Sequence, residues 1–346
     1  MTTPAPLRII QAGIGGHGAT WKHLLQRESE DGDRVQLVAV ADPSEWARAV
    51  AKEDGIPETH IFTDLAEALR FTEVDAVVIV TPPSTHRALA TLAITAGKHV
   101  LIEKPLATSI EDATALADLA DQQGITLMVS QNYRYQTGIR ALQAALRGGT
   151  YGTPVSADIT FMRDSRTYWP EDNFRYAMDH PLLLDMTIHH FDMLRAVLDR
   201  NATSITLESW RIPDSPYRGD VALDAQIILA DDIAVRYLGN WASTGPETTW
   251  NGDWQIVTDR GRLHWVGWLD DDREGAILWE PDGGTAEILR PEPLAITGIP
   301  ASLHAFVEAV RTGTSPETSA RDNIESLKLV FGGVTSTETG ASVTLS

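Results

Sequence analysis

The sequence predicts an α/β protein of two domains, an N-terminal parallel sheet covered by helices and a C-terminal α+β domain with a large, mostly antiparallel open sheet. Three observations predict this class. Up to about residue 130, short β-branched apolar runs alternate with segments of helical periodicity, the signature of repeated βαβ units. Beyond about residue 150, short strand-like runs are joined by tight turns. The length of 346 residues fits about two domains.

The N-terminal strands are nearly continuously apolar, as expected where helices cover both faces of a sheet. We expect residues 1–6 to be a disordered leader and residues 7–130 to form the first domain. The segments after Gly97 and Gly124 begin new strands, so these glycines end the helices before them. The predicted strands are LRIIQA, VQLVAVA, VDAVVIV, KHVLIE and ITLMVS, and helices are predicted over 84–96 and 109–123.

The second domain is predicted to span residues 131–346 and to begin close to the first, since no Gly/Ser-rich linker separates them. Hairpin signals such as PDGG and DRG connect several of its strands. The predicted strands are 155–162, 203–210, 223–229, 233–239, 253–258, 262–266, 276–280 and 285–289, and the predicted helices are 138–147, 183–198, 302–311 and 321–331.

Composition and charge exclude several classes of function. The chain has 28 Lys and Arg against 48 Asp and Glu, a net charge of −20, which repels nucleic acid. No window approaches 18 uncharged apolar residues, so no membrane span is expected. The absence of cysteine removes disulfides and thiolate metal sites. With no secretory pattern in MTTPAPLRII, we expect a cytoplasmic protein.

A glycine-rich turn follows the first strand directly. The segment GIGGHG places glycines in the spacing GxGxxG before a helical segment, which permits a tight turn and close approach of a pyrophosphate to the helix N-terminus. Alone, this spacing fits an ordinary Gly-rich turn equally well. Its place in a βαβ unit favours a dinucleotide site in a Rossmann domain. The residues expected to hold the cofactor here are Gly13, Ile14, Gly15, Gly16 and Gly18.

Asp42 ends the second predicted strand, where the dinucleotide fingerprint places an acid that binds the adenosine ribose hydroxyls. A carboxylate repels a 2′-phosphate, and Pro43 and Ser44 supply no cation to bind one. The sequence therefore favours NAD over NADP. The plainer alternative is a solvated carboxylate at a strand end.

Lys104 follows the fourth predicted strand, at the carboxyl edge where an open α/β sheet binds its ligands. An ammonium group there could donate to a substrate hydroxyl and favour loss of its proton. A surface pair with Glu103 explains the same residues equally well.

The predicted helix 183–198 carries an apolar stripe on one side and a polar row on the other. At i, i+4 spacing Asp185 can contact His189 and tune it for proton transfer, and Asp192 continues the row. The alternative is an Asp/His pair on a solvated helix face. A metal site is not expected, because His190 lies 100° around the helix from His189.

Together these motifs resemble the glucose-fructose oxidoreductase, inositol dehydrogenase and rhizopine-catabolism family, Gfo/Idh/MocA. The resemblance covers nearly the whole chain and rests on GIGGHG, VIVTPPSTH, AGKHVLIEKPL and DMTIHHFD. It implies an N-terminal Rossmann domain, and a C-terminal domain whose open sheet forms subunit contacts in a homo-oligomer, a dimer or tetramer. It also implies a Lys104–Pro105 peptide bond that is cis.

The resemblance further implies roles for individual residues. The catalytic group would be Lys104, Asp185 and His189, with Arg134 close to the substrate beside Lys104 and His189. Thr187 stands where many relatives have glycine, so its side chain should narrow whatever faces it. Asp192 is assumed to be structural. The cofactor cleft would be lined by Thr81, Pro82, Pro83, His86, Glu103 and Lys104.

The leading expectation is an NAD-dependent dehydrogenase that oxidises a secondary hydroxyl of a sugar, inositol or related polyol by hydride transfer to nicotinamide. One alternative keeps NAD tightly bound and oxidises a sugar transiently, for glycoside cleavage or for hydride transfer between sugars. The other is a non-catalytic dinucleotide-binding regulator. The set Lys104, Asp185 and His189 favours an enzyme, since a pure binder has no chemical need for it.

Overall fold

The structure is a computed structural model that describes residues 5–32, 34–266 and 276–345. The chain forms two compact units, residues 1–132 with 298–324 and residues 133–297 with 325–346. Most of the predicted leader, residues 1–4, lies outside the described residues. The first unit ends close to the predicted boundary, but it also takes in 298–324. The reason is that helix α8 (Gly298–Thr312) contacts strands β5 and β6 of the first unit.

The first unit contains a six-stranded sheet in the order β3-β2-β1-β4-β5-β6, and all its strands are parallel. This is the strand order of a Rossmann domain, which confirms the predicted fold class. The order reverses between β1 and β4, and a ligand site is expected in the crevice at that point. The strands are β1 (Leu7–Ala12), β2 (Val35–Ala41), β3 (Ile61–Phe62), β4 (Ala76–Ile79), β5 (His99–Glu103) and β6 (Leu127–Ser130).

Local sequence explains where the helices of this unit begin and end. Ser109 caps α5 by accepting a hydrogen bond from the backbone N–H of Asp112, and Gly124 ends that helix in the left-handed conformation. The short strand β3 and the helices α2 and α3 were not predicted. The helices are α1 (His17–Asp31), α2 (Glu45–Glu53), α3 (Leu65–Phe71), α4 (Pro83–Thr95) and α5 (Ile110–Gln123).

The second unit contains a nine-stranded sheet in the order β14-β13-β12-β11-β7-β10-β9-β8-β15. Its strand pairs are antiparallel except β7 with β10, which confirms a mostly antiparallel sheet. Every predicted strand of this domain is present. The strands are β7 (Pro154–Met162), β8 (Ala202–Trp210), β9 (Ala222–Leu229), β10 (Ala234–Asn240), β11 (Asp253–Thr258), β12 (Gly261–Trp265), β13 (Ile277–Pro281), β14 (Glu287–Leu289) and β15 (Val343–Thr344).

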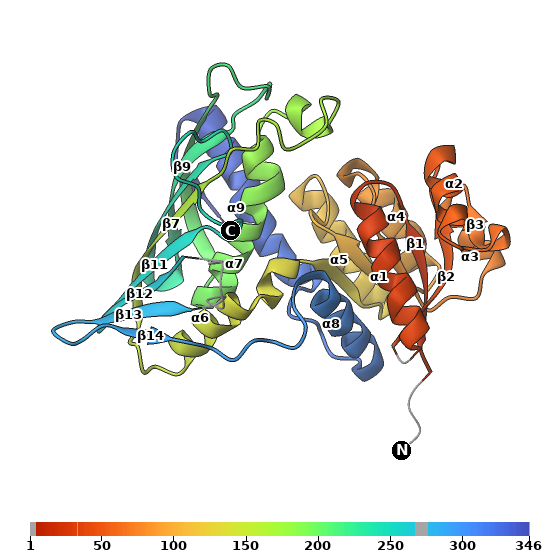
Figure 1. Cartoon of the computed structure of the whole chain (residues 1–346), viewed down its shortest axis with the longest axis horizontal. Helices are drawn as coiled ribbons and strands as arrows, with labels where there is room; N and C mark the ends of the chain where they lie inside the picture. Colours follow the sequence, from red (N-terminus) through yellow and green to blue (C-terminus); the bar gives the residue numbers. More distant parts are fainter. Residues whose placement is uncertain (1–4, 33, 267–275, 346) are drawn as a thin grey trace. The chain divides into compact units, whose positions relative to one another are not determined.

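Helices α6 (Thr137–Arg147), α7 (Ile188–Leu198) and the C-terminal part of α9 (Ala320–Thr339) lie on one side of this sheet (Figure 1). Gly333 in α9 allows a close approach, because a Cβ there would lie 3.0 Å from the side chain of Leu207 in β8. The predicted helix 183–198 is present but begins with one π-helical turn, η4 (Leu182–Thr187), before α7. All residues of α7 are buried, so its polar row is not a solvated face.

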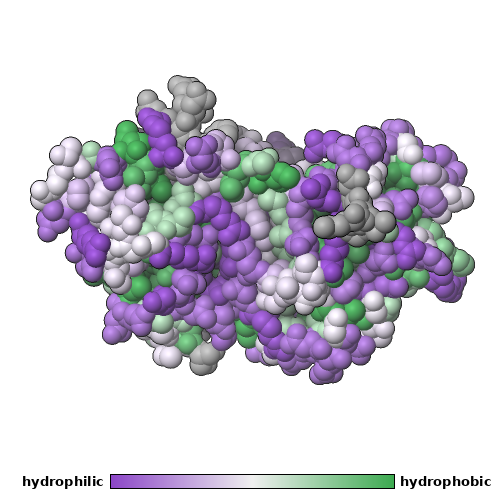
Figure 2. All heavy atoms as spheres, turned by 90° about the horizontal axis from the view of Figure 1, so that it is seen from below, coloured by the Kyte–Doolittle hydropathy of each residue, from purple (hydrophilic) through white to green (hydrophobic). Residues whose placement is uncertain are grey.

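The surface in view in Figure 2 is mostly hydrophilic, as expected for a chain in which 22% of the residues are charged. Figure 2 shows hydrophilic residues over most of the face that it presents, with hydrophobic residues in separate patches. Among the described residues, no helix is long and apolar enough to cross a membrane.

Candidate active site

The glycine-rich turn joins β1 to α1, and its glycines serve different purposes. A Cβ at Gly13 would lie 2.3 Å from the carbonyl oxygen of Val80, and one at Gly18 would lie 2.4 Å from the carbonyl oxygen of Gly13. Packing within the unit therefore requires both glycines. A Cβ at Gly15 would meet nothing within 4 Å. This open space at the N-terminus of α1 allows a pyrophosphate to approach the backbone closely. The geometry of the turn therefore fits a dinucleotide.

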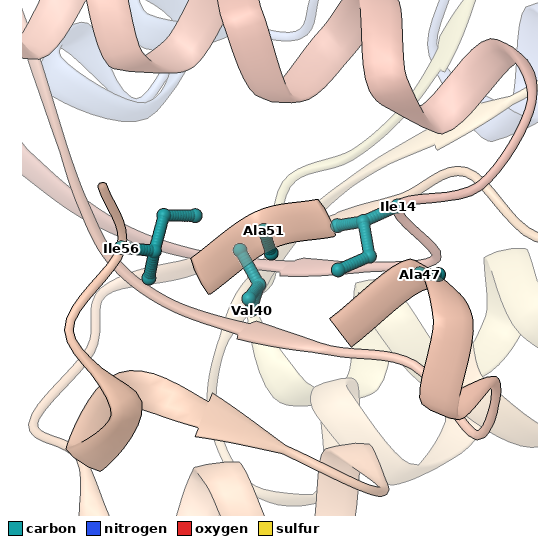
Figure 3. Close-up of a cluster of buried hydrophobic side chains, with 5 residues drawn as sticks. All are labelled: Ile14, Val40, Ala47, Ala51 and Ile56. Carbon is teal, nitrogen blue, oxygen red and sulfur yellow. The ribbon is translucent and has the colours of Figure 1, made fainter. Parts of the chain in front are cut away.

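Two neighbouring side chains hold the turn in place. Gln11 is fully buried in β1, and its side-chain amide donates to the carbonyl oxygens of Gly13 and Gly18, at 2.8 and 2.7 Å. Ile14 lies among Val40 and residues of α2 in a buried apolar cluster (Figure 3). The turn is thus held in place by the hydrogen bonds of Gln11 and by the apolar packing of Ile14.

Asp42 lies at the end of β2 and is 8% exposed. Its carboxylate accepts hydrogen bonds from the backbone N–H of Ile14, at 2.9 Å, and of Ser44, at 2.8 Å. The first of these bonds joins the predicted ribose-binding acid to the glycine turn. Arg48 donates to the backbone carbonyl of Asp42 at 2.7 Å. A positively charged side chain therefore lies close to Asp42, whereas the predicted preference for NAD over NADP considered only Pro43 and Ser44.

His86 joins the segment after β4 to the segment after β5. Its Nδ1 is 2.7 Å from the carbonyl oxygen of Pro105, and its Nε2 is 2.9 Å from that of Thr81. Burial lowers the pKa of His86, although both carbonyl oxygens act in the opposite direction. The Lys104–Pro105 peptide bond is cis, as the resemblance implied. His86 therefore holds the backbones of Thr81 and Pro105 together, beside segments that are predicted to line the cofactor cleft.

Glu103 lies beside the glycine turn and next to Lys104. Its carboxylate accepts a hydrogen bond from the indole of Trp21 at 2.8 Å and lies 3.3 Å from Nε2 of His17. The backbone N–H of Lys104 donates to it at 3.1 Å. Burial raises the pKa of Glu103, but His17, Trp21 and Lys104 together outweigh burial and lower it. Glu103 thus links the first turn of α1 to the backbone of the predicted catalytic lysine.

In the second unit, Asp185 lies in the π-helical turn η4, a feature that occurs often at functional sites. Its carboxylate binds the guanidinium of Arg175, with Nε 2.6 Å from Oδ2 and Nη2 3.4 Å from Oδ1. Arg175 was not predicted, because it lies ten residues before Asp185 in a segment that has no helical or strand periodicity.

His189 lies in the first turn of α7. Its ring stacks on that of Tyr133, with ring centroids 4.4 Å apart and an interplanar angle of 25°. Burial and the nearby charge of Asp185 raise the pKa of the Tyr133 hydroxyl. Tyr133, Asp185 and His189 therefore lie close together in one unit. Tyr133 was not predicted, although it belongs to the QNYRY segment.

Arg134, which the resemblance places close to the substrate, is paired with Asp192 in the second unit. Its Nε and Nη2 donate to the two carboxylate oxygens of Asp192, at 2.6 and 2.7 Å, and both side chains are buried. Ser326 donates to Asp192 at 2.7 Å as well. These bonds give Arg134 a structural role in joining its segment to α7, and they agree with the structural role assumed for Asp192.

The other polar residues of this helix form a separate buried network. Thr187 donates to the hydroxyl of Tyr237, which is 2.7 Å from Nδ1 of His190, and Nε2 of His190 is 2.9 Å from the carbonyl oxygen of Trp250. Burial lowers the pKa of His190 to about 4, so the ring is neutral and accepts from Tyr237. Thr187 is fully buried, and its side chain fills space beside Tyr237 in this core.

Within the described ranges, no group of three or more His, Asp and Glu residues is gathered that could hold a metal ion. Lys104 belongs to the first unit, whereas Asp185 and His189 belong to the second. Their convergence on one substrate thus stays a prediction.

Fold and turn geometry together indicate a dinucleotide-binding Rossmann domain. Residues 10–131 match the family described as oxidoreductase family, NAD-binding Rossmann fold, and residues 139–264 match the GFO/IDH/MocA C-terminal domain. The two matches span most of the chain, and the chain belongs to the Gfo/Idh/MocA family of oxidoreductases.

Relatives along the whole chain agree with this membership. A D-apiose dehydrogenase of Paraburkholderia graminis is 28% identical over 99% of this chain and 92% of its own. A myo-inositol 2-dehydrogenase of Thermotoga maritima is 25% identical over 90% of this chain and 92% of its own. An oxidoreductase from Agrobacterium radiobacter, crystallised with NAD+, L-tartaric acid and magnesium, shares the fold with a TM-score of 0.85, 21% identity and 98% coverage of both chains.

Proposed function

We propose that this protein is an NAD-dependent dehydrogenase that oxidises a secondary hydroxyl of a sugar, an inositol or a related polyol. Two relatives that align along nearly the whole chain are dehydrogenases of such compounds, D-apiose and myo-inositol. The observation that carries the proposal is the open space at Gly15 and Gly16, because it leaves room for a pyrophosphate between the closely packed glycines Gly13 and Gly18.

The first unit would hold the cofactor. The turn from Gly13 to Gly18 and the N-terminus of α1 would bind the pyrophosphate, and Asp42 would bind the adenosine ribose. Thr81 to Pro83, held by His86, would line the same cleft with Glu103. When bound, NAD supplies the hydride acceptor of the reaction.

Three residues would act on the alcohol. His189 takes the hydroxyl proton as general base, and Lys104 donates to the same oxygen and stabilises its developing negative charge. Asp185 orients and tunes His189. Arg134, whose guanidinium binds Asp192, would lie close to the substrate beside these residues.

The test is a panel of D-apiose, myo-inositol, scyllo-inositol, D-glucose and L-tartrate with NAD or NADP, followed by the absorbance of the reduced nicotinamide. We expect turnover with NAD and a polyol. Cofactor that stays bound through gel filtration, without net NADH formation, would favour transient sugar oxidation instead. NAD binding without any turnover would favour a non-catalytic regulator.

The catalytic assignment has its own test. Lys104→Met and His189→Asn should each lower turnover by about 10²–10⁴-fold and leave the Kd for NAD nearly unchanged. Lys52→Met is a matched control, because Lys52 is 58% exposed and pairs with Glu58 at the surface. Wild-type turnover in the Lys104 or His189 variant would refute the assignment.

We also propose a homo-oligomer that forms through the nine-stranded sheet. Helices α6, α7 and the C-terminal part of α9 lie on one side of the sheet (Figure 1). Leu207 of β8 faces α9, so Trp210, three residues further along the strand and 41% exposed, faces the other side. Light scattering should give a dimer or tetramer, and Trp210→Glu should weaken it. A monomer at micromolar concentration would contradict this proposal. We further propose a cytoplasmic location, which cell fractionation tests.

A further inference from the structure

Arg175 contacts two aromatic rings and a helix cap. The backbone N–H of Arg175 donates to Oδ1 of Asn173, which caps the short helix η3 (Phe174–Ala177). The guanidinium carbon lies 4.2 Å from the ring centroid of Trp169 and 4.6 Å from that of Phe174. Cation–π attraction to both rings helps to hold the planar cation in place.

The aromatic support of Arg175 is itself anchored in the core. The indole of Trp169 donates to the hydroxyl of Tyr217 at 3.2 Å and packs edge-on against Trp241, with centroids 6.3 Å apart. Tyr217 and Trp241 are each 1% exposed. The position of the guanidinium is thus set by the core of the second unit.

The fixed guanidinium in turn fixes Asp185. Nε and Nη2 of Arg175 reach the two oxygens of that carboxylate, and the two side chains are 19% and 16% exposed. Such a two-point contact restrains the rotation of the carboxylate, which a single point charge would not do. Asp185 lies four residues before His189, and its charge acts on Tyr133, whose ring stacks on that of His189.

We propose that Arg175 is a positioning residue that fixes the Asp185 carboxylate relative to the Tyr133–His189 stack. This proposal rests on the proposed function, because it assumes that Asp185 orients His189. At metal sites, removal of a residue that orients a metal ligand typically lowers metal affinity or activity by about 10- to 100-fold. We use the same range for a residue that orients Asp185. We expect Arg175→Ala to lower kcat by a factor in that range and to leave the Kd for NAD unchanged.

The experiment is a double-mutant cycle with Arg175→Ala, Asp185→Asn and both changes together. Steady-state kinetics would use NAD and the polyol of the panel that gives the highest rate. If Arg175 acts through Asp185, the double variant will have the kcat of Asp185→Asn within about twofold, because the shared effect is lost only once. Arg175→Lys keeps a positive charge but not the planar two-point contact, so it should recover kcat only in part.

Arg166→Ala is the matched control, since Arg166 forms a similar two-point ion pair with Asp164 in the same segment. It should keep wild-type kcat. If Arg175→Ala does not fold, Arg175→Lys carries the cycle, with its smaller loss expected to vanish in the Asp185→Asn background. Wild-type kcat in the Arg175 variants, or an equal further loss beside Asp185→Asn, would overturn the inference and leave the proposed function standing. Wild-type turnover of Asp185→Asn would overturn both.

Discussion

His190 should make the stability of the second unit depend on pH in a predictable direction. Burial lowers its pKa from 6.5 to about 4, and the hydrogen bond to the carbonyl oxygen of Trp250 offsets this only in part. Below about pH 6.5 the unfolded chain binds a proton that the folded protein excludes until about pH 4. The stabilising contribution is thus fully present above pH 6.5 and is lost as the pH falls from there towards 4.

The two pKa values set the magnitude of the loss. Between pH 7 and pH 5 this single group should lower the free energy of unfolding by about 2 kcal/mol. The assay is urea unfolding at both pH values, followed by tryptophan fluorescence, since eight of the ten tryptophans lie beyond residue 150. The comparison variants are His190→Gln and, as a control, His60→Gln at an exposed position.

His190→Gln should be less stable at pH 7, but it should lose about 2 kcal/mol less than the wild type on going to pH 5. His60→Gln should keep the wild-type dependence on pH. The reasoning is refuted if His190→Gln and the wild type lose the same stability between the two pH values, because the folded protein would then bind the proton as readily as the unfolded chain.

Three further predictions concern the cofactor turn, cofactor choice and the buried ion pair. Gly13→Ala should prevent or strongly destabilise folding, because its Cβ would lie 2.3 Å from a backbone oxygen, whereas Gly15→Ala should fold normally and bind NAD more weakly. Thermal melts and NAD titration check this pair of variants, and equal melting temperatures would contradict the distinction. Asp42→Ser should lower the preference for NAD over NADP by about tenfold, as the carboxylate no longer repels the 2′-phosphate; an unchanged ratio of kcat/KM values would count against it. Arg134→Met leaves Asp192 buried without its two-point partner and should cost about 3–5 kcal/mol in urea unfolding, and a loss below about 1 kcal/mol would exclude a structural role.

Much of the fold follows from local patterns in the sequence. Five of the six parallel strands are nearly continuous apolar runs, and helix ends coincide with glycines such as Gly124, so the positions of these elements could be predicted to within a few residues. The helices α2 and α3 were missed, because each is only two to three turns long. Residues 298–324 fall in the first compact unit, although the sequence places them in the second domain, because no local signal shows which sheet an amphipathic helix packs against.

The candidate site was predictable where one motif fixes the position, as for the glycine turn and Asp42. It was less predictable where partners come from distant segments. Helical spacing predicted that Asp185 can contact His189. It could not show that Asp185 lies in a π-helical turn or that its carboxylate binds Arg175. Gln11 was not predicted, but it did leave a signal in the sequence, because it is a polar residue near the end of a mostly apolar strand.

The central claim is that Lys104 of the first unit and His189 of the second act on the same substrate oxygen. A crystal structure of the protein with NAD and an accepted polyol tests it most directly. The account predicts that Nζ of Lys104 and a ring nitrogen of His189 both lie within about 3.2 Å of one hydroxyl oxygen. If the two groups bind different oxygens, or if only one of them reaches the polyol, the proposed chemistry is contradicted even though NAD is bound.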